Sequence, residues 1–472
     1  MPLTLVTGPA NSAKARAVLD GVRAALDREP LLVVPTGEDV DRYRRELAED
    51  GIVIGPRVVT FDDLLEEVAT RAAITARPLG ELGRERVVGA VLARTELHVL
   101  ATSAATPGFA RAAARLFGEL EVARVDPGRL AAGLRRWAGD DAARRAYGDE
   151  VARLYGRYRA ALDRLGRPDR ELWAVAALDA LRLAPAAWGG TPVFFYGFDD
   201  LTPLQRDAVE ALAKRVEADV WVSLTFEPGR MAFAGRAETY QALAPLADRE
   251  QAMPPNDAYY EPASRAALHA LERRIFEDGG APPVDPGGAV ALLEAGGERA
   301  EAELVGAEVL RLLAAGTPAH EIAVVTRSLE DAGPLLERVL GGMGIPLALR
   351  RRVPFGRTAT GRGVLALLRC AALDGTAADL VAALRAPGMA ADADADAVDE
   401  LERRVRRHGL ATAREALRLW DGELPALERL REAAASGAAA LCDALAAHLL
   451  AVQAAIAATA GAAPDQGALG EL

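Results

Sequence analysis

The sequence predicts an α/β protein built from two parallel-sheet domains with large helical insertions. Two observations carry this prediction. Short apolar segments of strand length alternate with helical segments in the first, middle and later parts of the chain, and the long stretches 71–185 and 361–472 show helical spacing alone. Alternation of strands and helices is typical of a parallel sheet covered by helices on both faces. The 472 residues are enough for three or four domains, at about 100–200 residues each.

The first predicted domain begins with three strand–helix pairs. Each expected strand is a short run of aliphatic residues or threonine, at 3–7, 31–34 and 58–60. The first expected helix ends at residue 26, and the next two cover 38–49 and 61–72. After the helical stretch, strands at 192–196 and 219–224 flank a helix at 202–216. We expect these strands to rejoin the first sheet, because buried parallel strands need partners on the same sheet.

A second α/β unit follows a segment rich in proline and glycine. Expected strands lie at 289–294 and 321–326, with helices at 299–315 and 329–340, and residues 345–349 are expected to be extended. Residues 461–472 contain no closing element, so we expect the chain to continue in a longer protein. The predicted boundaries are 1–70 and 186–276 for the first sheet domain, 71–185 for its helical insertion, 277–288 for the linker, 289–360 for the second sheet domain and 361–472 for a helical domain.

Composition excludes several classes of protein. The net charge of −12 excludes a polycation that coats nucleic acid, so any contact with nucleic acid requires a local basic patch. Two cysteines, Cys370 and Cys442, exclude a disulfide scaffold and a cysteine-rich metal site within this chain and fit a reducing cytoplasm. No signal peptide or membrane span is predicted. Lys14 and Lys214 are the only lysines, so motifs that require lysine can be tested exhaustively.

A phosphate-binding loop follows the first predicted strand. The template G-x-x-x-x-G-K-[ST] between a strand and a helix is matched by Gly8 and Lys14, with Ser12 in the loop. Ala13 replaces the second glycine, and Ala15 replaces the hydroxyl residue that would bind magnesium. We expect at most weak ATP binding without magnesium-dependent turnover, and we predict no other cofactor and no metal site. The plainer interpretation is a strand–turn–helix junction with one exposed lysine.

A second motif follows the strand expected at 192–196. It resembles the hydrolysis motif of UvrD/RecB-type helicases, and Asp200 and Gln205 match that motif. Tyr196 stands where the magnesium-binding aspartate would be, and Gly197 stands where the catalytic glutamate would be. Hydrolysis needs one carboxylate for the metal and another to orient water, so we predict no catalytic residues here. The plainer alternative is a buried strand followed by a helix that Asp199 and Asp200 cap.

In this order, and separated by a helical stretch, the two motifs resemble the AddB-type subunit of bacterial AddAB helicase–nucleases. More broadly they are similar to RecB-like proteins of the PD-(D/E)xK nuclease family. Segments 58–65, 300–303, 322–328 and 344–346 add to the likeness. The resemblance implies two RecA-like (P-loop NTPase-like) domains. It also implies an inactivated helicase-like subunit that binds DNA and an active subunit of the AddA type in double-strand-break repair.

The nuclease domain of that family is not expected within this chain. Its motif places a lysine two residues after an acidic residue, whereas Lys14 follows Ser12 and Lys214 follows Leu212 at that spacing. The domain is therefore expected beyond residue 472, or lost. Arg350, Arg351 and Arg352 form a dense basic cluster, which indicates either a solvated surface or a contact with DNA phosphates. Two alternatives stay open: an active P-loop ATPase or helicase with atypical metal ligands, and a protein-interaction scaffold without DNA binding.

Overall fold

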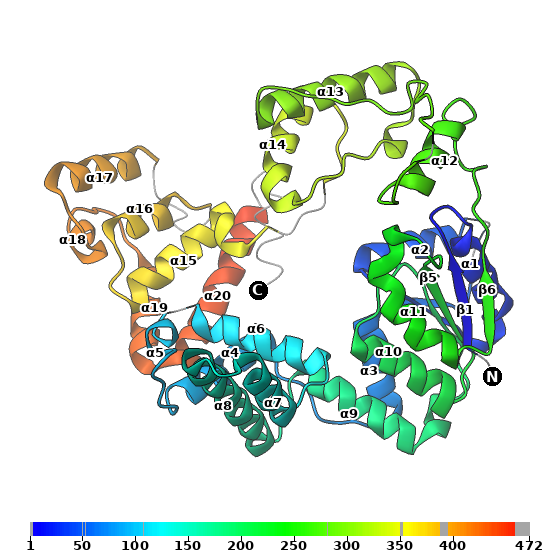
Figure 1. Ribbon diagram of the computed structural model, residues 1–472. Coiled ribbons are helices and arrows are strands. Elements are labelled where there is room, and N and C mark those ends of the chain that lie inside the picture. Colours follow the sequence, from blue (N-terminus) through cyan, green and yellow to red (C-terminus); the bar gives the residue numbers. More distant parts are fainter. Residues whose placement is uncertain are drawn as a thin grey trace. The chain divides into compact units, whose positions relative to one another are not determined.

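The computed structural model describes residues 3–49, 51, 53–106, 108–280, 282–349, 353–387 and 395–457. The chain forms two compact units, Met1–Ala291 and Leu292–Leu472, and each is described by itself. The first unit contains a parallel sheet and a helical insertion, and the second is helical in the residues that the structure describes (Figure 1).

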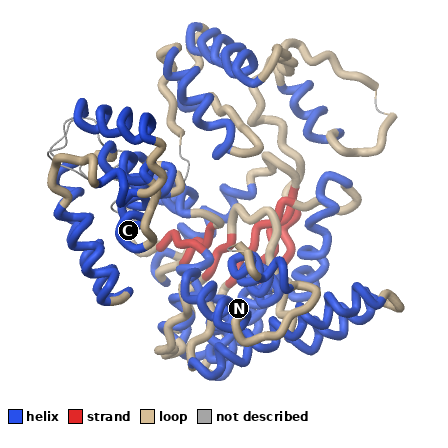
Figure 2. Tube along the Cα trace, turned by 90° about the vertical axis from the view of Figure 1, so that its left-hand side faces the viewer, coloured by secondary structure: helices blue, strands red, loops and turns tan. Residues whose placement is uncertain are grey.

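Six parallel strands form the sheet of the first unit, in the order β3-β2-β4-β5-β1-β6. Figure 2 shows the strands in red among the helices that cover them. Their bounds are Leu3–Gly8 (β1), Leu31–Val34 (β2), Arg57–Thr60 (β3), Val193–Phe195 (β4), Val220–Thr225 (β5) and Arg249–Ala252 (β6). The α/β class and the return of β4 and β5 to the first sheet are thereby confirmed. The edge strand β6 was not predicted.

The central strands are apolar on both faces because helices cover both faces. Side chains such as Leu5, Val33 and Phe195 pack against one set of helices, α3 (Phe61–Arg71), α9 (Arg170–Leu183) and α10 (Pro203–Glu210). Leu32 and Phe194 point to the opposite face, where α1 (Lys14–Ala24) and α2 (Gly37–Leu47) lie. Alternate residues of one strand therefore serve two cores. Helices α11 (Ala237–Leu243) and α12 (Arg265–Arg274) complete the unit.

The insertion between β3 and β4 is a bundle of helices, as predicted. After α3 it contains α4 (Glu81–Leu92), α5 (Ala101–Ala104), α6 (Phe109–Val122), α7 (Pro127–Ala138), α8 (Ala142–Leu165) and α9. Tyr155 and Tyr158 of α8 are fully buried beside Phe117 of α6, with ring centroids 5.2 and 5.1 Å from it. This aromatic group and the aliphatic side chains of α4 give the insertion its own core.

The second unit lacks the predicted strands in the part of the chain that the structure describes. Helices α13 (Glu298–Ala314) and α14 (Leu329–Gly342) form close to their predicted positions. Segments 289–294 and 321–326 pair with no strand, and Leu292 and Val325 are each 90% exposed. Aliphatic sequence alone does not form a strand, because an isolated strand leaves its backbone groups unpaired.

Helices make up the rest of the second unit. They are α15 (Ala359–Ala372), α16 (Ala377–Arg385), α17 (Ala395–His408), α18 (Ala413–Leu417), α19 (Pro425–Ser436) and α20 (Ala438–Ala457). They pack around an Ala- and Leu-rich core that includes the buried Cys370. Among the helices with described residues, none combines the length and the apolar character needed to cross a bilayer.

Candidate functional site

The phosphate-loop sequence lies between β1 and α1, as its motif requires. Gly8 ends β1 with a φ of +153°, and a Cβ atom there would come within 2.6 Å of Ser12 Oγ and 2.7 Å of the Met253 carbonyl oxygen. Glycine is therefore the residue that this turn accepts. Ser12 is buried and its hydroxyl donates to the Pro9 carbonyl at 2.9 Å.

The two alanines of the loop have different backbone conformations. Ala13 adopts a left-handed conformation, with φ 63° and ψ 21°, which costs an alanine about 1 kcal/mol relative to glycine. Ala15 lies in the first turn of α1 and has no hydroxyl. The loop therefore keeps a glycine-like backbone at position 13 but has no oxygen ligand for a metal at position 15.

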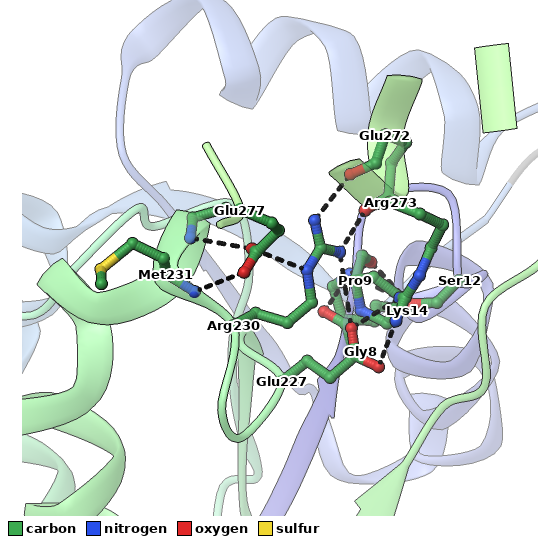
Figure 3. A network of polar contacts seen from close by, with 11 residues as sticks. Gly8, Pro9, Ser12, Lys14, Glu227, Arg230, Met231, Glu272, Arg273 and Glu277 are labelled. Carbon is green, nitrogen blue, oxygen red and sulfur yellow. Dashed lines mark hydrogen bonds and ion pairs between the residues drawn. The ribbon is translucent and has the colours of Figure 1, made fainter. Parts of the chain in front are cut away.

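Lys14 is folded back onto its own loop rather than exposed (Figure 3). Its side chain is buried, and Nζ donates hydrogen bonds to the Gly8 carbonyl at 3.0 Å, the Ser12 hydroxyl at 3.1 Å and the Pro9 carbonyl. Burial lowers the pKa of Lys14 from 10.5 to about 8; the Glu272 charge opposes this shift and the Arg236 charge adds to it. The ammonium group therefore directs its hydrogen bonds at oxygens of its own loop, and we call this arrangement the closed loop.

The second motif follows β4, and its first two residues have no acidic function. The ring of Tyr196 packs edge-on against Tyr43 of α2, with centroids 5.4 Å apart, and burial raises its pKa. Gly197 has a φ of +85°, and a Cβ there would lie 3.4 Å from Pro35 Cδ. A glutamate at position 197 would be strained in this backbone.

The aspartates of the second motif do not cap α10, contrary to the plainer sequence interpretation. Thr202 is the N-cap and forms a capping box with Gln205. Asp199 instead accepts a hydrogen bond from Arg236 at 3.0 Å, and Asp200 accepts one from Thr239. Threonine followed three residues later by glutamine already carries the capping signal, so the sequence contains the correct assignment.

Arg236 connects the two motifs. It lies at the end of a 3-10 turn, Met231–Arg236, and its guanidinium donates to both the carbonyl and the carboxylate of Asp199. Its charge also acts on Lys14. The carboxyl ends of parallel strands share one edge of a sheet, which brings the loops after β1 and β4 near one another.

A network of charged residues lies beside the phosphate loop and was missed by sequence reasoning (Figure 3). Arg230, whose side chain is 8% exposed, pairs with Glu272 at 2.9 Å, Glu277 at 3.1 Å and Glu227 at 3.5 Å. Arg273 forms a bidentate pair with Glu227, with distances of 2.6 and 3.0 Å. Two arginines therefore face three glutamates.

This network ties α12 to the loop that follows β5. Phe226 N donates to the Gly8 carbonyl at 3.2 Å, so Glu227 directly follows a residue that contacts the phosphate loop. Glu272 of α12 is close enough for its charge to influence Lys14. No sequence pattern marks these residues, because they are ordinary helix and loop charges until the fold brings them together.

Three carboxylates of the insertion could be mistaken for a metal site. One oxygen each from Glu121, Asp169 and Glu171 lies within 4.8 Å of the others. The guanidinium of Arg84 is already among them, 3.2 Å from Glu171, 3.7 Å from Glu121 and 3.8 Å from Asp169. Gly118 makes room for it, since a Cβ there would lie 2.5 Å from Nη2 of Arg84. Arg84 therefore supplies the positive charge.

The basic cluster Arg350, Arg351 and Arg352 lies outside the described residues. The two motifs, in contrast, are both described and lie on loops at one edge of the sheet.

Comparisons with known proteins agree on one family. A family model described as "ADDB, N-terminal" matches residues 5–272. The chain is also similar to bacterial proteins that are named as one subunit of an ATP-dependent helicase/deoxyribonuclease. It is 28% identical over 391 residues to that of Pelotomaculum thermopropionicum, covering 75% of this chain and 32% of the relative. It is 29% identical over 402 residues to that of Symbiobacterium thermophilum, covering 78% and 34%. It is 30% identical over 395 residues to that of Moorella thermoacetica, covering 75% and 33%.

Proposed function

The chain belongs to the AddB N-terminal family, and from this premise we propose that it is a non-hydrolysing, helicase-like part of a bacterial helicase–nuclease. It spans about a third of the length of the curated relatives that it matches. In this proposal it binds DNA and an active partner subunit of the AddA type in the cytoplasm, during repair of double-strand breaks.

The observation that carries the proposal is the engagement of Lys14 by its own loop. An ATPase loop needs this lysine for the β- and γ-phosphates, a hydroxyl for magnesium and a carboxylate to orient water. Here Lys14 donates to three loop oxygens, and Ala15, Tyr196 and Gly197 supply neither hydroxyl nor carboxylate to a metal or a water. Several independent requirements for hydrolysis are lost together, which supports loss of the activity.

Charge near the loop gives further support. Glu227, Glu272 and Glu277 outnumber Arg230 and Arg273 in the adjacent network. A triphosphate would bring several negative charges beside these carboxylates, and the cost rises where water is excluded. The network therefore disfavours nucleotide at the place where the motif would bind it.

DNA-binding titrations at several salt concentrations test the proposal. The chain should bind DNA alone or together with an AddA-type helicase, with an affinity that falls as salt rises. ATP turnover should stay at background, and Lys14→Ala should leave both properties unchanged. Absence of DNA binding, both by the chain alone and together with the AddA-type helicase, would refute the proposal. ATP turnover that disappears in Lys14→Ala would instead establish the rival function, a P-loop ATPase with atypical ligands, which the retained Gly8 and Lys14 favour.

A further inference from the structure

The helical insertion is positively charged although the chain as a whole is acidic. Residues 71–185 contain twenty arginines against fourteen aspartates and glutamates, a net charge of +6, whereas the whole chain carries −12. Many of these arginines are neutralised within the insertion or by the sheet. Arg111 pairs with Glu85 at 2.7 Å, for example, and Arg115 pairs with Glu119 at 3.3 Å. The remaining positive charge must lie elsewhere on its surface.

A groove between α4 and α8 contains three arginines without acidic partners. Its volume is about 460 Å³, and its floor is made of small or aliphatic side chains such as Ala90 and Ala161. Arg94 lies two residues beyond the end of α4, and Arg157 and Arg164 belong to α8. Within the described part of the chain, no carboxylate lies within 4.0 Å of these three guanidinium groups.

One of the three arginines is held in place, and the other two are free to bind. Arg157 donates to the carbonyl of Arg94 at 2.7 Å and to the hydroxyl of Thr95 at 2.9 Å, which fixes α8 to the end of α4. Arg94 and Arg164 are exposed. Arg157 and Arg164 are seven residues apart, so they lie on one face of α8 about 10 Å apart along its axis.

We propose that the groove between α4 and α8 binds the phosphates of a DNA backbone through Arg94, Arg157 and Arg164. This inference rests on the proposed function and adds to it the surface that contacts DNA. Charges spread over about 10 Å suit a polyanion better than one small anion. Guanidinium groups bind phosphate oxygens in a bidentate manner. The groove has no aromatic side chain on which a base could stack, so it contacts the backbone and reads no sequence.

Charge reversal at the two free arginines tests this inference. The variant is Arg94→Glu/Arg164→Glu in the full 472-residue chain, and Arg157 is left intact because it joins two helices. The matched control is Arg111→Glu/Arg115→Glu, which makes the same change in net charge on α6. Fluorescence anisotropy with labelled single-stranded and duplex DNA measures the affinity at several salt concentrations. A third variant, Arg94→Lys/Arg164→Lys, keeps the charge and reports on folding.

The groove variant should lose affinity by at least about tenfold relative to the control, and the lysine variant should keep most of it. For the groove variant, the slope of log K against log salt should be shallower than that of the control by roughly 1.4 for single-stranded DNA or 1.8 for duplex DNA. This difference corresponds to the loss of two phosphate contacts. Equal affinity and slope for groove and control variants would overturn the inference while the proposed function stands. Competition by polyglutamate as strong as by DNA of equal charge would also overturn it, since the groove would then accept any acidic polymer. Absence of DNA binding by the unmodified chain would instead refute the proposed function.

Discussion

The titration of Lys14 is the most direct test of the structure around the phosphate loop. Only two lysines occur, so selective ¹³C and ¹⁵N labelling of lysine gives two sets of side-chain signals, and Lys214→Arg identifies them. The structure predicts that Lys14 loses its proton with a pKa of about 8 rather than 10.5, because burial disfavours the ammonium group. The perturbation is pH alone, followed by NMR.

The magnitude of this shift also has a consequence for stability. The gap between 10.5 and about 8 corresponds to about 3 kcal/mol at about 1.4 kcal/mol per pKa unit. Below pH 8 both the folded and the unfolded chain hold the proton, so the contribution of Lys14 to stability does not change with pH. Between pH 8 and 10.5 the folded chain releases the proton first, so stability increases with pH. Lys14→Met should remove this increase, and the difference between the two proteins isolates it from tyrosine and cysteine titrations.

Nucleotide addition extends the same experiment to function. A triphosphate bound at the loop would raise the pKa of Lys14, since nearby negative charge favours the ammonium form. The closed loop predicts no change in the Lys14 signal when ATP and magnesium are added. A pKa of Lys14 near 10.5, equal to that of an exposed lysine, would refute the buried arrangement. A large upward shift with ATP would refute the closed loop.

Three further changes test other parts of the structure. Ala13→Gly should stabilise the fold by up to about 1 kcal/mol because the backbone there is left-handed, whereas Ala15→Gly in α1 should destabilise it by about as much; urea unfolding distinguishes them, and the same sign for both would contradict the loop conformation. Arg230→Ala should weaken the attachment of α12 by roughly 1–3 kcal/mol, since it leaves Glu272 and Glu277 without their cation while Glu227 keeps Arg273, and hydrogen exchange should become faster in α12 than in the Arg274→Ala control. Burial, with Asp169 nearby, raises the pKa of Glu121, so its contribution to stability declines as pH rises through neutrality; Glu121→Gln should flatten this dependence, and a variant that melts well below the native chain at pH 9 would contradict it.

Local sequence signals predicted the first sheet well because its strands are short, apolar and regularly followed by helices. They could not predict β6, whose sequence Arg-Glu-Gln-Ala is polar and forms a strand only because β1 offers it an open edge. They over-predicted strands at 289–294 and 321–326, where aliphatic residues have no paired neighbour in the described structure. A strand depends on its partner, and no single segment contains that information.

Some residues of the candidate site could likewise be predicted from the sequence, and others could not. Gly8, Lys14, Tyr196 and Gly197 were found from the sequence, because each occupies a numbered position in a short motif. The charges beside Lys14 come from distant parts of the chain, the loop after β5 and helix α12, which contribute residues such as Glu272. Spacing within a motif identifies what the loop has lost, but only the fold identifies what now surrounds it.

The backbone after β4 does not accept the carboxylates of a hydrolysis motif without rearrangement. Glutamate at position 197 would require a change from the left-handed conformation that Gly197 now adopts beside Pro35. Aspartate at position 196 would leave the Tyr43 ring without its packing partner and bury a charge in an apolar cluster. Tyr196 and Gly197 therefore suit the packing around them, and two carboxylates at these positions would require the surrounding structure to change.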